Sequence, residues 1–238
     1  MNPFLPAAAA VGNAPFIWAT AILLAIVSIL HLRSCLVERP LLRYITKPFL
    51  MPAVILLHIA ICGFSHPLVI AALVFGCIGD IFLMFISKRR ANFVLGLLSF
   101  LIGHIFYIAA AFSAGLPQRA FGSPHGALLL IVCIAVMLAG GASVFAFLYS
   151  HIYKKLRLPC AAYILVLTSM AFTMIYCCLG GFRIATLLMA LGGALFIVSD
   201  FILSCKVFGV FKGRRMNFTV MFTYIAAQIC LAVGFALV

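Results

Sequence analysis

Eight apolar segments, each about long enough to cross a bilayer, follow one another along this 238-residue chain. An α-helix rises 1.5 Å per residue, so about 20 apolar residues span the hydrocarbon core of a membrane. Lipid cannot hydrogen-bond to the backbone, whereas a helix satisfies its own backbone groups. The alternating pattern of a membrane β-barrel is absent. We therefore predict an all-α, multi-pass membrane protein with spans at about 14–33, 47–64, 67–87, 91–113, 126–149, 158–179, 183–205 and 216–237.

The composition agrees with this interpretation. Hydrophobic residues make up 67% of the chain, against about half in a soluble domain. The connections between the spans are short and leave no room for a separate soluble domain. We expect residues 1–13 to form an N-terminal tail and residues 14–238 a single transmembrane domain. The compact size and the lack of a retention signal favour a bacterial inner membrane.

The charges predict the orientation of the spans. The chain has sixteen Lys and Arg residues but only three acidic residues, giving a net charge of +13. In a soluble protein this excess would suggest nucleic-acid binding. Here the basic residues lie between the spans, which instead indicates membrane topology and contact with anionic lipid headgroups. Fourteen of them follow the first, third, fifth and seventh spans, and only Arg119 and Arg183 lie on the other side. We predict cytoplasmic loops at those four places and both termini outside.

A weak internal repeat links the third span to the seventh. The segments GDIFLMFISKRRANF and SDFILSCKVFGVFKGRRMNF both contain Asp-x-x-Leu and then Arg-Arg-x-Asn-Phe. This alignment places Asp80 on Asp200, and Asn92 on Asn217. It predicts two four-helix halves in parallel orientation, related by an axis along the membrane normal.

Asp80 and Asp200 are the acidic residues within the spans. A carboxylate inside a bilayer costs several kcal/mol unless it is protonated, paired or hydrated, so such a residue suggests a functional site. Both lie a few residues before the predicted cytoplasmic end of their span and hence at a similar depth. Two close carboxyl groups can share one proton and thereby supply a general acid and a general base. The alternative is that each acid only hydrogen-bonds neighbouring helices.

Other polar residues within the spans are candidates to line the same cleft. His104 and Gln228 match in the repeat, Tyr107 lies one turn from His104, and Tyr224 one turn from Gln228. We expect these four to contact a substrate, with packing as the competing interpretation of His104.

Three candidates lie at the predicted cytoplasmic edge. Asn92 and Asn217 begin the fourth and eighth spans, where helix capping is an equally good interpretation. Lys47 and Pro48 are predicted to open the second span, since proline suits a first helical turn. Lys47 is a candidate for binding a lipid phosphate, although extension towards the headgroups is the favoured interpretation.

Motifs for cofactors and metals are missing. The chain has no GxSxG elbow, P-loop, GxGxxG or HExxH motif, and its histidines show no metal-ligand spacing. We therefore expect neither a metal nor an organic cofactor.

Three segments resemble the YhhN family, which includes the animal lysoplasmalogenases: GCIGDIFLMF, RANFVLGLLSFLIGHIFYIAAAF and LGGALFIVSDFIL. The resemblance runs from about residue 20 onward and includes Lys47-Pro48 and RRMNFTVMFTYIAAQ. It implies an eight-helix membrane hydrolase whose paired aspartates correspond to Asp80 and Asp200. Characterised members cleave the vinyl ether bond of lysoplasmalogens to a fatty aldehyde and glycerophosphoethanolamine or glycerophosphocholine.

The implied chemistry suits two carboxyl groups. Vinyl ether hydrolysis begins with protonation of the β-carbon, and water then adds to the resulting oxocarbenium ion. One carboxyl can give the proton, and one carboxylate can stabilise the cation and activate water. The expected partners are a lysophospholipid and membrane lipids. Two alternatives remain open, namely a transporter that uses the acids as proton relays and a non-enzymatic scaffold. Oligomeric state is left open by the sequence.

Overall fold

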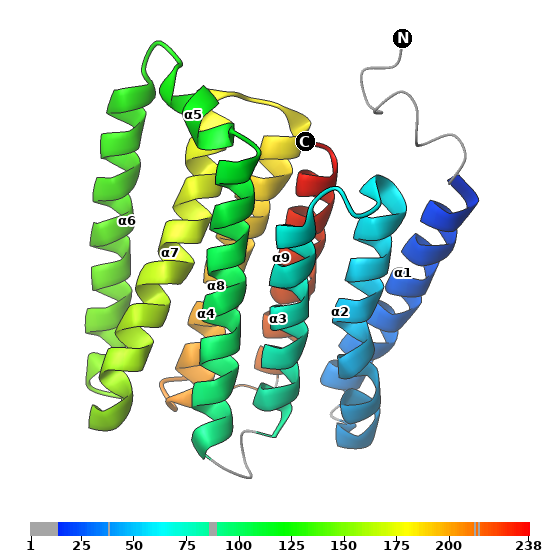
Figure 1. Ribbon diagram of the computed structural model, residues 1–238. Coiled ribbons are helices and arrows are strands. Elements are labelled where there is room, and N and C mark those ends of the chain that lie inside the picture. The colour runs from blue at the N-terminus through cyan, green and yellow to red at the C-terminus, as the bar shows by residue number, and fades with distance from the viewer. Residues whose placement is uncertain (1–13, 38, 86–89, 212, 214) are drawn as a thin grey trace.

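The computed structural model describes residues 14–37, 39–85, 90–211, 213 and 215–238, and this part of the chain is helical, without strands (Figure 1). Eight of its helices are long and apolar enough to cross a membrane, which confirms the prediction of an all-α chain with eight candidate spans. The predicted N-terminal tail, residues 1–13, lies outside the described residues. The helices are α1 (Ala14–Leu36), α2 (Pro40–Cys62), α3 (Pro67–Met84), α4 (Arg90–Ser113), α5 (Leu116–Phe121), α6 (Gly126–Tyr149), η1 (Lys154–Leu156), α7 (Arg157–Gly180), α8 (Ile184–Val207) and α9 (Met216–Ala236).

The start of the second span was predicted wrongly. Helix α2 begins at Pro40, about two turns before Lys47, and Pro48 and Pro52 lie inside it. Proline fits the first turn because its missing N–H has no helical partner there, and Pro40 occupies that position. An internal proline removes one backbone hydrogen bond, yet α2 continues through both. Lys47 consequently lies within the bundle instead of at the helix end.

A short helix that the sequence did not reveal, α5, connects α4 to α6. Gly115 adopts a left-handed conformation, with φ of 66°, where α4 has ended and α5 starts. Glycine takes this conformation without the steric cost that a Cβ imposes. Leu116 and Ala120 of α5 are buried against the bundle. With six residues, α5 is too short to show helical periodicity in the sequence.

Six helices form a closed ring in the order α2, α3, α4, α7, α8, α9, each packed against the next and α9 against α2. Helix α1 packs outside α2 and α9, and α6 lies outside α7 (Figure 1). Gly192 and Gly193 allow α8 to approach two neighbours closely. A Cβ on Gly192 would lie 2.9 Å from the Ala227 carbonyl oxygen of α9, and one on Gly193 would lie 2.8 Å from Ala171 Cα of α7.

The two ends of the bundle differ in charge. The first residue of α1 and the last of α9 lie at the same end (Figure 1). At the opposite end, α1, α3, α6 and α8 finish and α2, α4, α7 and α9 begin. We call this the basic end, because the described basic residues other than Arg119 and Arg183 are in or beside it. That this end faces the cytoplasm, and that the halves are repeats, stay predictions.

Candidate active site

A cavity of about 680 Å³ lies towards the basic end, where it is bordered by α1, α2, α3, α4, α8 and α9. Asp80 from α3 and Asp200 from α8 both line it. The prediction that the two acids border one cleft therefore agrees with this geometry. The cavity walls also include three cations and further polar groups: Arg43, Lys47, Lys206, Asn217 and Tyr224.

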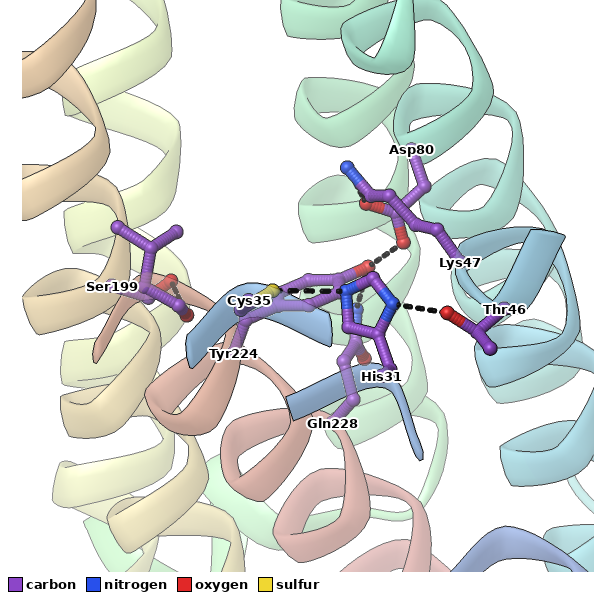
Figure 2. A network of polar contacts seen from close by, with 9 residues as sticks. His31, Cys35, Thr46, Lys47, Asp80, Ser199, Tyr224 and Gln228 are labelled. Atoms are coloured by element: carbon purple, nitrogen blue, oxygen red, sulfur yellow. Dashed lines mark hydrogen bonds and ion pairs between the residues drawn. The ribbon is translucent and has the colours of Figure 1, made fainter. Parts of the chain in front are cut away.

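Asp80 is buried and has two partners (Figure 2). The Lys47 ammonium lies 3.1 Å from Asp80 Oδ1 and forms an ion pair. The Tyr224 hydroxyl donates to Asp80 Oδ2 at 2.8 Å. Lys47 therefore points into the bundle. The interpretation favoured from the sequence, that Lys47 extends towards the headgroups, is wrong. A buried carboxylate needs a compensating charge, and the early start of α2 places Lys47 deep enough to supply it.

The Asp80 network continues through two further predicted residues. Gln228 Nε2 lies 3.4 Å from the Tyr224 hydroxyl oxygen, and the Tyr107 hydroxyl donates to Gln228 Oε1 at 2.7 Å. Both Tyr107 and Gln228 are buried behind Tyr224 and are not part of the cavity wall. A Cβ on Gly76 would lie 3.2 Å from Gln228 Nε2, so glycine leaves room for this amide. The chain Tyr107–Gln228–Tyr224–Asp80 thus links α4, α9 and α3.

Asp200 has a separate set of partners. The Tyr163 hydroxyl, from α7, donates to Asp200 Oδ2, and His104 Nε2 lies 3.3 Å from the same hydroxyl oxygen. Because the tyrosine proton points to Asp200, His104 must donate through Nε2–H. The buried Nδ1 of His104 then has no hydrogen-bond partner. Asp200 is less buried than Asp80, and in the described part of the chain it forms no ion pair.

Tyr163 was missed at the sequence level, although its position contained a signal. It lies six residues after α7 begins, and Asp200 lies seven residues before α8 ends. Both helix ends are at the basic end, so the two residues share a depth. A buried tyrosine hydroxyl usually finds a hydrogen-bond partner. A depth comparison of every polar residue in the spans would have paired them.

Two phenylalanines lie between the networks. The Phe196 ring packs edge-on against His104, with centroids 4.6 Å apart, and against Tyr224 at 5.5 Å. Phe100 also contacts Tyr224 edge-on at 5.9 Å and borders the cavity. The Phe196 ring therefore lies between His104 of the Asp200 network and Tyr224 of the Asp80 network.

One comparison with known proteins identifies the family. A model of the YhhN family matches residues 42–235. The chain belongs to the YhhN family. The match extends from α2 to α9 and so includes both acids, Lys47, Tyr163 and Tyr224. Comparisons with curated proteins and with solved structures found no match.

The remaining YhhN site candidates fall in different places. Asn217 borders the cavity and accepts a hydrogen bond from Lys206. Asn92 is outside the cavity wall, where its Nδ2 donates to the Phe85 carbonyl oxygen at the end of α3 at 2.8 Å. His31 of α1, not anticipated, borders the cavity and contacts Thr46 Oγ1 at 2.8 Å (Figure 2). No group of three His, Cys, Asp or Glu residues suited to a metal occurs within the described ranges.

Proposed function

We propose that this YhhN protein is a membrane-embedded hydrolase that cleaves the vinyl ether bond of lysoplasmalogens. The products would be a fatty aldehyde and glycerophosphoethanolamine or glycerophosphocholine. One observation carries the proposal: Asp80 and Asp200 line the same cavity, at the end of the bundle where basic residues gather. Family membership supports the class of reaction, and the acid pair supplies groups that can perform it without a cofactor.

The different surroundings of the two acids suggest different roles. The Lys47 ion pair stabilises Asp80 as a carboxylate. Asp200 accepts a hydrogen bond from Tyr163 on Oδ2 but has no cation among its described partners. A carboxyl group among apolar helices is more stable with its proton when no cation is near. We assign Asp200 as the proton donor and Asp80 as the carboxylate that faces the developing cation.

The proposed reaction conserves atoms and protons. Asp200 transfers its proton to the β-carbon of the vinyl ether, and the adjacent carbon becomes part of an oxocarbenium ion. Asp80 stabilises this cation and takes a proton from the water that adds to it, forming a hemiacetal. The bond between this carbon and the glycerol oxygen then breaks. The glycerol oxygen takes the proton from Asp80, and the hemiacetal hydroxyl returns a proton to Asp200 as the aldehyde forms.

The other candidate residues have supporting roles in this proposal. Lys47 and Tyr224 fix the Asp80 carboxylate from two sides, and Asn217 lies at the cavity wall near the basic end. His104 holds Tyr163, while Tyr107 and Gln228 hold Tyr224 from behind. Asn92 holds the carbonyl group of Phe85, which caps α3 five residues after Asp80. These contacts keep both carboxyl groups oriented before substrate binds.

Mass spectrometry of products tests the function directly. Purified protein is incubated with lysolipids of matched chain length that carry an alkenyl, alkyl or acyl group. We expect aldehyde release from the alkenyl lipid alone, and acyl cleavage alone would overturn the proposal. Asp80→Asn and Asp200→Asn should each lower turnover by at least about a hundredfold while leaving the elution profile of the purified protein unchanged. Ser143→Ala is the matched control, because Ser143 is exposed on α6 and bonds only within its own helix.

A transporter is the competing function. The intramembrane acids and the repeat-like halves are compatible with it, and many transporters also contain broken helices. Helix α8 runs unbroken from Ile184 to Val207, and Gly192 and Gly193 serve close helix packing. The structure therefore offers no broken helix at this position. Proton-coupled lipid movement in liposomes, without any product, would favour the transporter over the hydrolase.

A further inference from the structure

The cavity contains more positive than negative charge. Arg43, Lys47 and Lys206 face only two described acids, Asp80 and Asp200, across its walls. The ion pair with Asp80 compensates Lys47. Asp200 forms no ion pair among the described residues. Arg43 and Lys206 therefore have no acidic partner in the described part of the chain. An excess of uncompensated cations at the mouth of a cavity attracts an anionic ligand.

Arg43 provides the first direct sign of a missing partner. It lies one helical turn before Lys47 on α2, and hence on the same face and nearer the basic end. Its guanidinium Nε is buried and has no hydrogen-bond partner. A buried charged donor without an acceptor is costly, and a ligand oxygen in the cavity would satisfy it. Guanidinium groups bind phosphate oxygens through two parallel hydrogen bonds.

Lys206 completes the cationic pair from the other side of the cavity. It lies on α8, six residues beyond Asp200 towards the basic end, which corresponds to about 9 Å along the helix axis. Its ammonium group donates to Asn217 Oδ1, a neutral acceptor that fixes its position but does not compensate its charge. Lys206 is also more exposed than Arg43, as expected at a cavity mouth.

We infer that Arg43 and Lys206 form a phosphate subsite that binds the phosphodiester of a single-chain phospholipid. The inference rests on the proposed function for the identity of the lipid, and it adds residues and a determinant of substrate selection. The glycerol backbone would extend from this subsite to Asp80 and Asp200, which lie deeper in the cavity. The vinyl ether bond, at the other end of the glycerol, would then be placed between the two acids.

The walls of the cavity favour a lipid phosphate over free phosphate. Apolar side chains from α3, α8 and α9 border the same space as the two cations, and they suit the glycerol and hydrocarbon parts of an amphiphile. They are Leu83, Met84, Leu203, Val207, Val220 and Met221. Inorganic phosphate or glycerophosphocholine would leave this apolar surface uncovered.

Binding of lipids that cannot be cleaved tests the subsite without relying on turnover. The probes are a 1-O-alkyl-glycerophosphocholine and the corresponding 1-O-alkylglycerol, which has the same chain but no phosphate. We expect Arg43→Gln and Lys206→Gln each to weaken binding of the phospholipid by about tenfold or more. Binding of the alkylglycerol should stay within about twofold. Arg33→Gln and Arg215→Gln, exposed at the same end and absent from the cavity wall, are the matched controls.

Each outcome separates the subsite from the reaction. If the variants bind both lipids equally weakly, the proposed subsite is wrong. It is also wrong if the Arg43/Lys206 double variant binds the phospholipid normally, even if the protein releases aldehyde. Loss of phosphate preference in a protein that cleaves no lysolipid would support the subsite and reject the hydrolase. Competition by glycerophosphocholine or inorganic phosphate at concentrations near that of the lipid would show a site for free phosphates and contradict our assignment.

Discussion

Each of the two acids accepts a hydrogen bond from one tyrosine hydroxyl, but among the described residues only Asp80 also has a cationic partner. Tyr224 donates to Asp80, which also forms an ion pair with Lys47. Tyr163 donates to Asp200, and His104 contacts the Tyr163 hydroxyl. Removing the hydroxyl group of Tyr163 or of Tyr224 should therefore lower turnover to different extents. For Asp80, Lys47 still fixes the carboxylate, whereas Asp200 loses its described hydrogen-bond donor.

The first prediction compares Tyr163→Phe with Tyr224→Phe. Asp200 becomes a charged carboxylate as it gives up its proton, and a hydrogen bond to a charged group is worth about 1.5–3 kcal/mol. Tyr163→Phe should therefore lower kcat by about ten- to a hundredfold with a small change in KM. Tyr224→Phe should have a weaker effect because Lys47 remains. Steady-state kinetics with an alkenyl lysolipid measures both, and a larger loss in Tyr224→Phe would contradict the proposed roles of the acids.

The second prediction concerns the ion pair. Lys47→Met leaves the Asp80 carboxylate in the bundle without its cation, and breaking a buried pair in this way costs about 3–5 kcal/mol. The variant should unfold at a clearly lower temperature in detergent. The double variant Lys47→Met/Asp80→Asn should regain most of that loss, since it removes both charges. A double variant as unstable as the single one would show that Lys47 acts through packing instead.

Part of this residue-level arrangement could be predicted from sequence. An acid in an apolar span is conspicuous, so Asp80 and Asp200 were identified. Repeat matching brought in Gln228, and helical spacing from Gln228 brought in Tyr224. The inward direction of Lys47 was not predictable, because its depth depends on where α2 begins. The cations at the cavity mouth were assigned to loops because the predicted spans were too short: Arg43 lies in α2 and Lys206 in the last turn of α8.

At the level of helices, α8 carries a site residue and also packs closely against two neighbours. It presents Asp200 to the cavity, and its two glycines bring it against α9 and α7. The contact with α7 matters for the site, since α7 holds Tyr163. We therefore expect the α7–α8 spacing at Gly193 to affect the hydrogen bond from Tyr163 to Asp200.

The third prediction tests this spacing. Gly193→Ala would place a Cβ 2.8 Å from Ala171 Cα, where backbone must move. Overpacking of this kind costs about 1–3 kcal/mol, so we expect a lower unfolding temperature and reduced turnover. Gly140→Ala on α6 is the matched control because nothing lies within 4 Å of its added Cβ. Similar behaviour of the two variants would mean that the α7–α8 contact does not control the site.

Helix positions were predictable to the extent that hydropathy alone determines them. The spans near 67, 91, 126, 158, 183 and 216 begin within a few residues of α3, α4, α6, α7, α8 and α9. The start of α2 was not, because Pro40, Arg43 and Lys47 make its first two turns less apolar than a span. The short α5 depends on the turn at Gly115 and on burial by neighbouring helices, and neither leaves a periodic signal.

For the whole molecule, the ring of six helices is filled in one half and hollow in the other. Away from the basic end, Tyr107 stacks on Phe235 with centroids 5.9 Å apart, and Met170, Met174 and Met189 are fully buried. Towards the basic end the cavity replaces this packing. A lipid with a charged headgroup would thus enter from the basic end, and the membrane leaflet that it comes from follows from the orientation of the bundle.

The last prediction concerns that orientation. The bias of basic residues indicates that the basic end is cytoplasmic. An epitope inserted after Gly209, in the connection between α8 and α9, should be cut by added protease only after the cells are lysed. An epitope after Val238, at the other end, should be accessible in intact spheroplasts. The reverse pattern would place the cavity mouth outside. The protein would then act on lipids of the outer leaflet, and the basic residues around the mouth would have to be explained by ligand binding alone.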